Sequence, residues 1–228
     1  MWEAIEESNL AFGTHTGSGE PEYPNHPASS AVMMFEFGLF TNRTLSHLII
    51  GGVFERFPEL RFTMTEQGVK WVAETLSRLD GTYTAVADRP WLEMFVREAY
   101  KDLSLTPTEY FQRNCFIGAS VLRPGEVATA ANLGTSNVMW GSDYPHREST
   151  YPYSVHSLRV ALADLNEQQR REVLSETAAK VYGFDLDALR PLADKYGPSP
   201  EALSTPLTAD ELPTDNEWFL PEMLTLAR

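Results

Sequence analysis

Short apolar runs alternate with amphipathic segments along the first part of the chain. Four of these runs end at turn residues and are typical of buried parallel strands: residues 10–15, 60–66, 115–119 and 137–143. Between them, apolar positions recur at helical spacing over residues 44–57, 69–79, 89–100, 125–133, 153–162 and 166–182. Alternating strands and helices predict an α/β fold with a parallel sheet and right-handed crossovers.

The pattern weakens after residue 185. The last segment, 186–228, is acidic and repeatedly interrupted by proline. We therefore expect a barrel-like domain over residues 1–185 and an irregular, partly ordered tail over residues 186–228.

Three of the four predicted strands end in side chains that can bind a metal or carry a proton. These are His15, Glu66 and Asp143. In parallel α/β folds, ligands bind at the carboxyl ends of the strands. Asp143 is the leading candidate for a metal ligand and proton acceptor, and His15 offers an imidazole nitrogen suited to zinc or manganese. The alternatives are an Asp that caps a loop and a His bonded to the backbone.

Glu66 and three further side chains are secondary candidates in the same region. Glu66 could act as a base or hold a substrate hydroxyl, and it could equally pair with Lys70. His146 is placed to support Asp143 or to touch substrate. Arg123 follows a strand and could hold a substrate carboxylate, and His26 lies in a proline-flanked loop that could cover the site.

Charge and cysteine content narrow the function classes. The net charge of -14 opposes binding to nucleic acid or to anionic lipid. Cys115 is the one cysteine, so a disulfide within the chain is excluded. The chain has neither a membrane-length apolar span nor a signal-peptide pattern at its start, and we expect a cytoplasmic protein.

Four stretches resemble the amidohydrolase-related family, in its aminocarboxymuconate-semialdehyde decarboxylase-like branch. They are residues 140–146 (Trp-Gly-Ser-Asp-Tyr-Pro-His), 51–60, 66–80 and 13–17. The resemblance implies a TIM (β/α)8-barrel fold and one divalent ion, zinc or manganese, bound by His15 and Asp143. It implies hydrolysis of an ester, lactone or amide, or decarboxylation of an aromatic or unsaturated acid. The substrate would be a small organic acid or ester.

Two departures from the family pattern shape these expectations. The first predicted strand resembles the family's fifth, so the chain looks like strands five to eight only, and four strands cannot close an eight-stranded barrel. We expect a homo-oligomer or a missing N-terminal half-barrel to cover the open sheet edges. Glu66 stands where characterised decarboxylases of the branch carry a catalytic His, which weakens the expectation of decarboxylation and leaves hydrolysis open.

Two other interpretations stay open at this point. Catalytic zinc usually takes three protein ligands, and this chain offers two leading ones, so it could be an inactive or partner-requiring fragment. A metal-free binder of small molecules at the same strand ends is a further alternative.

Overall fold

The computed structural model describes residues 1–86, 89–123, 126, 129, 132–147, 149–211 and 213 of the 228-residue chain. The chain forms two compact units. Unit 1 comprises Met1–Gln67 and Trp71–Ile117, and unit 2 comprises Gly68–Lys70 and Gly118–Arg228.

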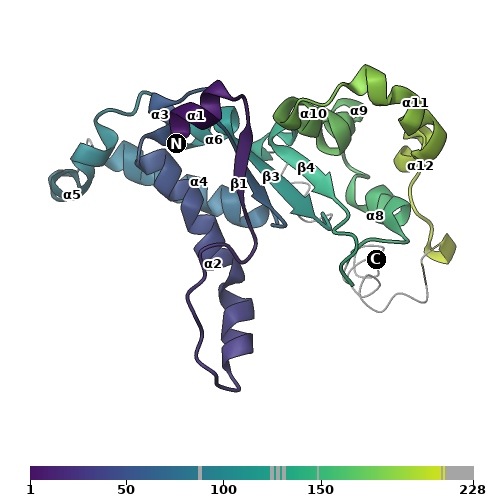
Figure 1. The fold of residues 1–228 in the computed structure, drawn as a ribbon, viewed down its shortest axis with the longest axis horizontal. Coiled ribbons are helices and arrows are strands. Elements are labelled where there is room, and N and C mark those ends of the chain that lie inside the picture. The colour runs from purple at the N-terminus through teal and green to yellow at the C-terminus, as the bar shows by residue number, and fades with distance from the viewer. Residues whose placement is uncertain are drawn as a thin grey trace. The chain divides into compact units, whose positions relative to one another are not determined.

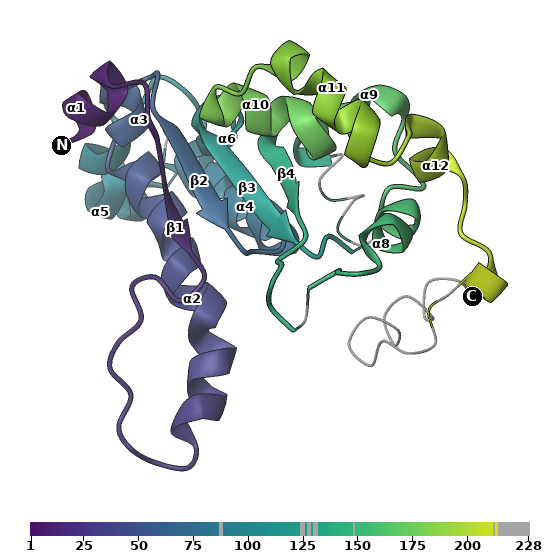
Figure 2. The same cartoon turned by 45° about the vertical axis from the view of Figure 1, so that its right-hand side comes forward.

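Four strands form one sheet in the order β1-β2-β3-β4 (Figure 2). They are β1 (Ala11–His15), β2 (Arg61–Thr65), β3 (Cys115–Ser120) and β4 (Val138–Gly141). β1 runs parallel to β2, with Phe12 opposite Phe62 and His15 opposite Thr65. All four strands fall on the apolar runs of the sequence, and the predicted parallel α/β fold is confirmed.

Unit 1 surrounds β1 and β2 with helices. They are α1 (Trp2–Glu7), α2 (Ser29–Ile50), α3 (Val53–Arg56), α4 (Lys70–Ala85, its first residue in unit 2), α5 (Pro90–Tyr100) and α6 (Pro107–Asn114). Its core is made of side chains with relative exposures of 2% or less: Leu45, Ile49, Phe54, Phe62, Met64, Val72, Leu76, Tyr110 and Phe111. The predicted extra helix over residues 89–100 is present as α5.

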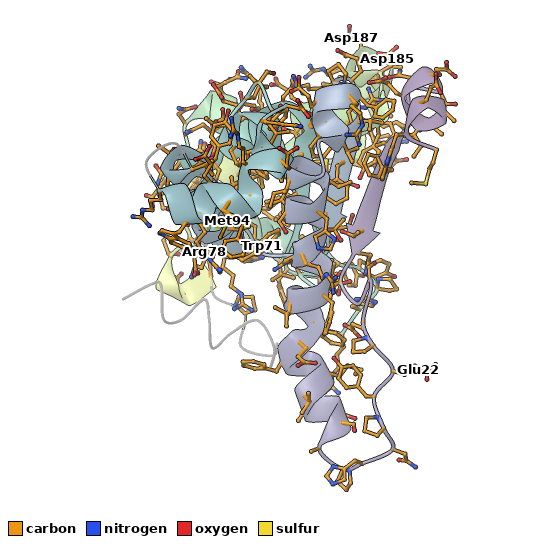
Figure 3. The ribbon with its side chains drawn as sticks, turned by 90° about the vertical axis from the view of Figure 1, so that its left-hand side faces the viewer. Glu22, Trp71, Arg78, Met94, Asp185 and Asp187 are labelled. Atoms are coloured by element: carbon orange, nitrogen blue, oxygen red, sulfur yellow. The ribbon has the colours of Figure 1, made fainter. Side chains whose placement is uncertain are left out.

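The first half of α2 extends beyond the rest of unit 1, alongside the loop that precedes it (Figures 1 and 2). Glu22 lies on this loop, well away from Trp71 and Arg78 of α4 (Figure 3). The loop is joined to the helix where the Tyr23 hydroxyl donates to Glu36 at 2.7 Å. Phe35, on the helix, is 91% exposed.

Unit 2 packs helices against β4. The helices are α8 (Ser154–Ala161), α9 (Glu167–Arg171), η2 (Glu172–Glu176, a π-helical turn), α10 (Thr177–Tyr182), α11 (Leu186–Tyr196) and α12 (Pro200–Ser204), with 3-10 turns η1 (Thr135–Asn137) and η3 (Ala209–Glu211). β4 contacts η2 and α10. Asn166 and Gln169 form the expected capping box, and the segment ends at Gly183 with φ 74°.

One segment differs from the sequence expectation, and another cannot be compared with it. The segment after residue 185 contains α11 and α12, where the prolines predicted an irregular tail. The predicted helix over residues 125–133 lies largely outside the described residues. None of the helices in the described part of the chain is both long and apolar enough to cross a membrane.

Candidate metal centre

The ends of three strands share an unusual backbone conformation. Glu66 follows β2 with φ 58°, Val121 follows β3 with φ 51°, and Asp143 lies just after β4 with φ 63°. Left-handed φ is uncommon for residues other than glycine, and strained conformations of this kind cluster at functional sites. Two of the three positions carry the carboxylates that the sequence singled out.

In unit 1, the strand-end turn is fixed by hydrogen bonds between β1 and β2. The Thr16 amide donates to the Thr65 carbonyl at 3.2 Å, and the Thr16 hydroxyl makes a short bond to the Glu66 carbonyl. The His15 amide donates to the Ser18 hydroxyl at 3.1 Å. These contacts hold the backbone of both His15 and Glu66.

The two ring nitrogens of His15 have different partners. Nδ1 lies 2.9 Å from the Thr16 carbonyl oxygen, which can only accept, so this contact is a hydrogen bond in the tautomer that carries its proton on Nδ1. Nε2 lies 2.9 Å from the Glu66 carboxylate oxygen Oε2. A neutral ring would then present the Nε2 lone pair to another acceptor. A proton on Nε2, a proton on the Glu66 carboxyl, or a cation bound by both atoms resolves this conflict.

The His15 geometry fits a metal ligand. Histidines that bind metals usually donate the proton of their other nitrogen to a carbonyl or carboxylate, and Thr16 supplies that acceptor here. The side chain of His15 is 58% exposed and that of Glu66 is 22% exposed. The ring is therefore accessible, and its neighbouring carboxylate adds negative charge.

In unit 2, Asp143 is largely covered and lies in a well-bonded loop. Its side chain is 12% exposed, and Oδ2 lies 3.1 Å from Nδ1 of His146. The His146 amide donates to the Asp143 carbonyl at 2.9 Å, and the Thr150 amide donates to the Ser142 carbonyl at 2.9 Å. The loop thus positions the carboxylate and the imidazole together.

The donor atoms suit a borderline divalent ion. Glu66 and Asp143 each offer a carboxylate oxygen, and His146 offers an imidazole nitrogen. Imidazole with carboxylate is a common donor set for zinc and manganese. The two ligands predicted from the sequence, His15 and Asp143, therefore each carry a donor atom of a kind that suits such an ion.

The two remaining predicted residues, His26 and Arg123, make local hydrogen bonds. His26 Nδ1 accepts the Ala28 amide at 3.1 Å, just before α2, and this bond serves the local turn. Arg123 lies beyond β3, and its amide donates to Glu126 at 3.2 Å. Glu126, which is 9% exposed, was missed from the sequence because nothing in its spacing distinguishes it from a surface helix residue.

Comparisons with known proteins place the chain in a family. The sequence model of the family described as amidohydrolase matches residues 1–184. No curated protein matches the chain at a comparable level of significance.

The chain is also similar to solved structures. A 5-carboxyvanillate decarboxylase, LigW from Sphingomonas paucimobilis, is 27% identical with a TM-score of 0.61, covering 81% of this chain and 52% of its own. A second, LigW2 from Novosphingobium aromaticivorans, was solved with bound manganese and 3-methoxy-4-hydroxy-5-nitrobenzoic acid; it is 21% identical with a TM-score of 0.60, covering 80% and 50%. A 2,6-dihydroxybenzoate decarboxylase from Rhizobium is 17% identical with a TM-score of 0.55, covering 82% and 54%.

The chain spans about half the length of the solved structures it matches. This share agrees with the expectation of four strands from an eight-stranded barrel. The family resemblance noted in the sequence is confirmed by the family match and by the structural neighbours. The chain belongs to the amidohydrolase family.

Proposed function

We propose that this chain contributes to metal-dependent chemistry on a small aromatic or unsaturated carboxylic acid, or on an ester, lactone or amide. One divalent ion, manganese or zinc, would be held by His15 and Asp143. The observation that carries the proposal is the His15 ring, whose Nδ1 is committed to the Thr16 carbonyl while Nε2 faces the Glu66 carboxylate.

Each candidate side chain has a definable task in this proposal. The ion would supply Lewis acidity towards a substrate oxygen. Asp143 Oδ2 would accept a proton during hydrolysis, and its hydrogen bond to His146 would hold it in position. Glu66 would act as a base or hold a substrate hydroxyl.

The neighbours support the substrate class. The LigW structures are named as decarboxylases of 5-carboxyvanillate, an aromatic acid, and one of them binds manganese with a nitrobenzoic acid. Arg123 would pair with a carboxylate of the substrate. We assign His26 a part in covering bound substrate, from the loop before α2 that also holds Tyr23.

We also propose that turnover requires further barrel strands from another polypeptide segment or a second copy of the chain. The support is the four-stranded sheet, whose outer strands are β1 and β4, and the half-length match to the solved structures. An exposed edge strand offers unpaired backbone groups to a partner strand. By itself, the chain would then be inactive while still holding its own part of the centre.

The proposal is tested by turnover assays with manganese or zinc present. Aromatic carboxylic acids would be screened for carbon dioxide release, and aryl esters and lactones for hydrolysis, with Asp164→Asn as the control for Asp143→Asn. Asp164 is exposed and lies in the same unit. We expect Asp143→Asn to lower turnover by at least about 100-fold, the usual scale for general acid–base catalysis. Where the control has measurable turnover, equal turnover in Asp143→Asn would contradict the role of Asp143.

A further inference from the structure

A small cavity opens in unit 2 beyond the end of β3. Its volume is about 300 Å³, and its described lining residues are Gly68, Lys70, Ser120, Val121, Arg123 and Glu126. Two of these side chains are cationic in a chain whose net charge is -14. A local positive site on an acidic protein can select an anionic ligand, because the field near a site need not follow the net charge.

Glu126 builds the wall of this cavity. Its carboxylate accepts the Val69 amide at 3.1 Å through Oε1 and the Arg123 amide at 3.2 Å through Oε2. A Cβ added at Gly68 would lie 2.3 Å from Oε1, so a side chain at this position would force the Glu126 carboxylate to move. Glu126 therefore ties the segment that follows Glu66 and Gln67 to the segment that follows β3.

The charges around the cavity favour an anion. Lys70 and Arg123 contribute two positive charges, and the single negative charge of Glu126 has a backbone N–H on each of its oxygens. The side chain of Ser120 adds a hydroxyl that can donate. Arginine and lysine with a hydroxyl donor form a common binding set for carboxylates.

The cavity lies beside the strand end that leads to Asp143. The Val121 amide donates to the Gly141 carbonyl at 3.1 Å. A Cβ at Gly141 would lie 3.8 Å from the Ser120 hydroxyl oxygen, and Gly141 precedes Asp143 by two residues. The cavity and Asp143 thus lie at the ends of two neighbouring strands, β3 and β4.

We infer that this cavity is an anion subsite, in which Lys70, Arg123 and Ser120 bind a carboxylate of the substrate other than the group that reacts. The inference rests on the proposed function and makes it more specific: the preferred substrates carry a second acidic group. Lys70, Ser120 and Arg123 are then specificity-determining residues, and Glu126 is a positioning residue for them.

The test compares benzoate with benzene-1,3-dicarboxylate by calorimetric titration of the full chain, with and without manganese. The variants are Lys70→Gln, Arg123→Gln and the double substitution. Arg78→Gln is the control, because Arg78 is an exposed cation of α4 in unit 1. We expect the dicarboxylate to bind about tenfold more tightly than benzoate, a ratio that corresponds to about 1.4 kcal/mol.

The substitutions should remove this preference, with a larger loss of affinity for the dicarboxylate than for benzoate. A dicarboxylate preference that survives the double substitution, or equal affinities in the wild-type chain, would overturn the subsite. Manganese separates the two proposals. If manganese strengthens both acids and the substitutions change nothing, the subsite is wrong and the proposed function stands. If manganese has no effect while the substitutions still weaken the dicarboxylate, the subsite stands and the proposed function is wrong.

Discussion

The Asn114 side chain holds the start of β2, one of the strands that carry the candidate centre. Asn114 is fully buried, and its Nδ2 donates to the carbonyls of Pro58 and Leu60, each at 2.8 Å. Its Oδ1 accepts from Arg113 Nε at 2.9 Å. One amide thus satisfies the backbone where the chain enters β2, the strand that leads to Glu66.

Replacing this side chain should cost much of the stability of the unit. Asn114→Ala leaves two backbone carbonyls without their buried donor, and we expect the free energy of unfolding to fall by about 2–4 kcal/mol. Urea denaturation followed by circular dichroism measures the change. The exposed Asn25→Ala serves as the control, and a loss below about 0.5 kcal/mol in Asn114→Ala would show that the amide is dispensable.

The residues of the centre differ in how far the sequence could predict them. His15, Glu66 and Asp143 were found because each ends an apolar run, and parallel strands collect their carboxyl ends at one edge. The left-handed φ of Glu66 and Asp143 could not be predicted, because strand ends impose no sequence requirement for it. Glu126 was missed because its partners, Val69 and Arg123, are backbone groups that leave no mark on the sequence.

At the scale of elements, the strands were predicted closely and several helices were not. The first half of α2 was missed, because residues 31–40 are apolar on nearly every face and show no amphipathic period. α6 was also missed, although Thr106, Pro107 and Glu109 carry the sequence signals of a helix start and form a capping box. The helix is only eight residues long, which leaves too little periodicity to detect.

Arg159 binds the segment over residues 205–211 to α8. Arg159 of α8 donates to the carbonyls of Thr205 and Pro206, each at 2.8 Å, and pairs with both carboxylate oxygens of Glu211 at 2.7 and 2.9 Å. Hydrogen bonds from Arg159 and then from Thr208 lower the pKa of Glu211 to about 2. The segment over residues 205–211 is thereby fastened to α8.

This attachment should depend on pH in a defined direction. Because the pKa of Glu211 is lowered from 4.5 to about 2, the ionised form stabilises the attachment above pH 4.5, and the contribution disappears as the pH falls towards 2. The protection of the Thr208 amide against hydrogen exchange, measured by NMR at each pH and corrected for the intrinsic exchange rate, reports how much of this attachment remains. Glu211→Gln should show low protection at every pH, and protection equal to that of the wild-type chain at pH 7 would contradict the assignment.

At the scale of the whole molecule, the chain combines a family match over residues 1–184 with about half the length of the related structures. Its four-stranded sheet ends in β1 and β4. The sequence predicted this half-barrel because the apolar runs matched the family's later strands and lacked its first metal motif. It could not identify the substrate, because the polar groups of the candidate subsite, Lys70, Ser120 and Arg123, come from separate segments with no regular spacing.

The most direct measurement is the metal content of the purified chain after incubation with manganese or zinc, determined by elemental mass spectrometry. We expect about one tightly held ion per chain, lost in His15→Ala and in Asp143→Ala. The controls His47→Ala and Asp164→Ala, both at exposed positions, should keep it. A chain that binds no ion, or that binds it equally well without His15 and Asp143, would contradict the assignment of these residues as the ligands.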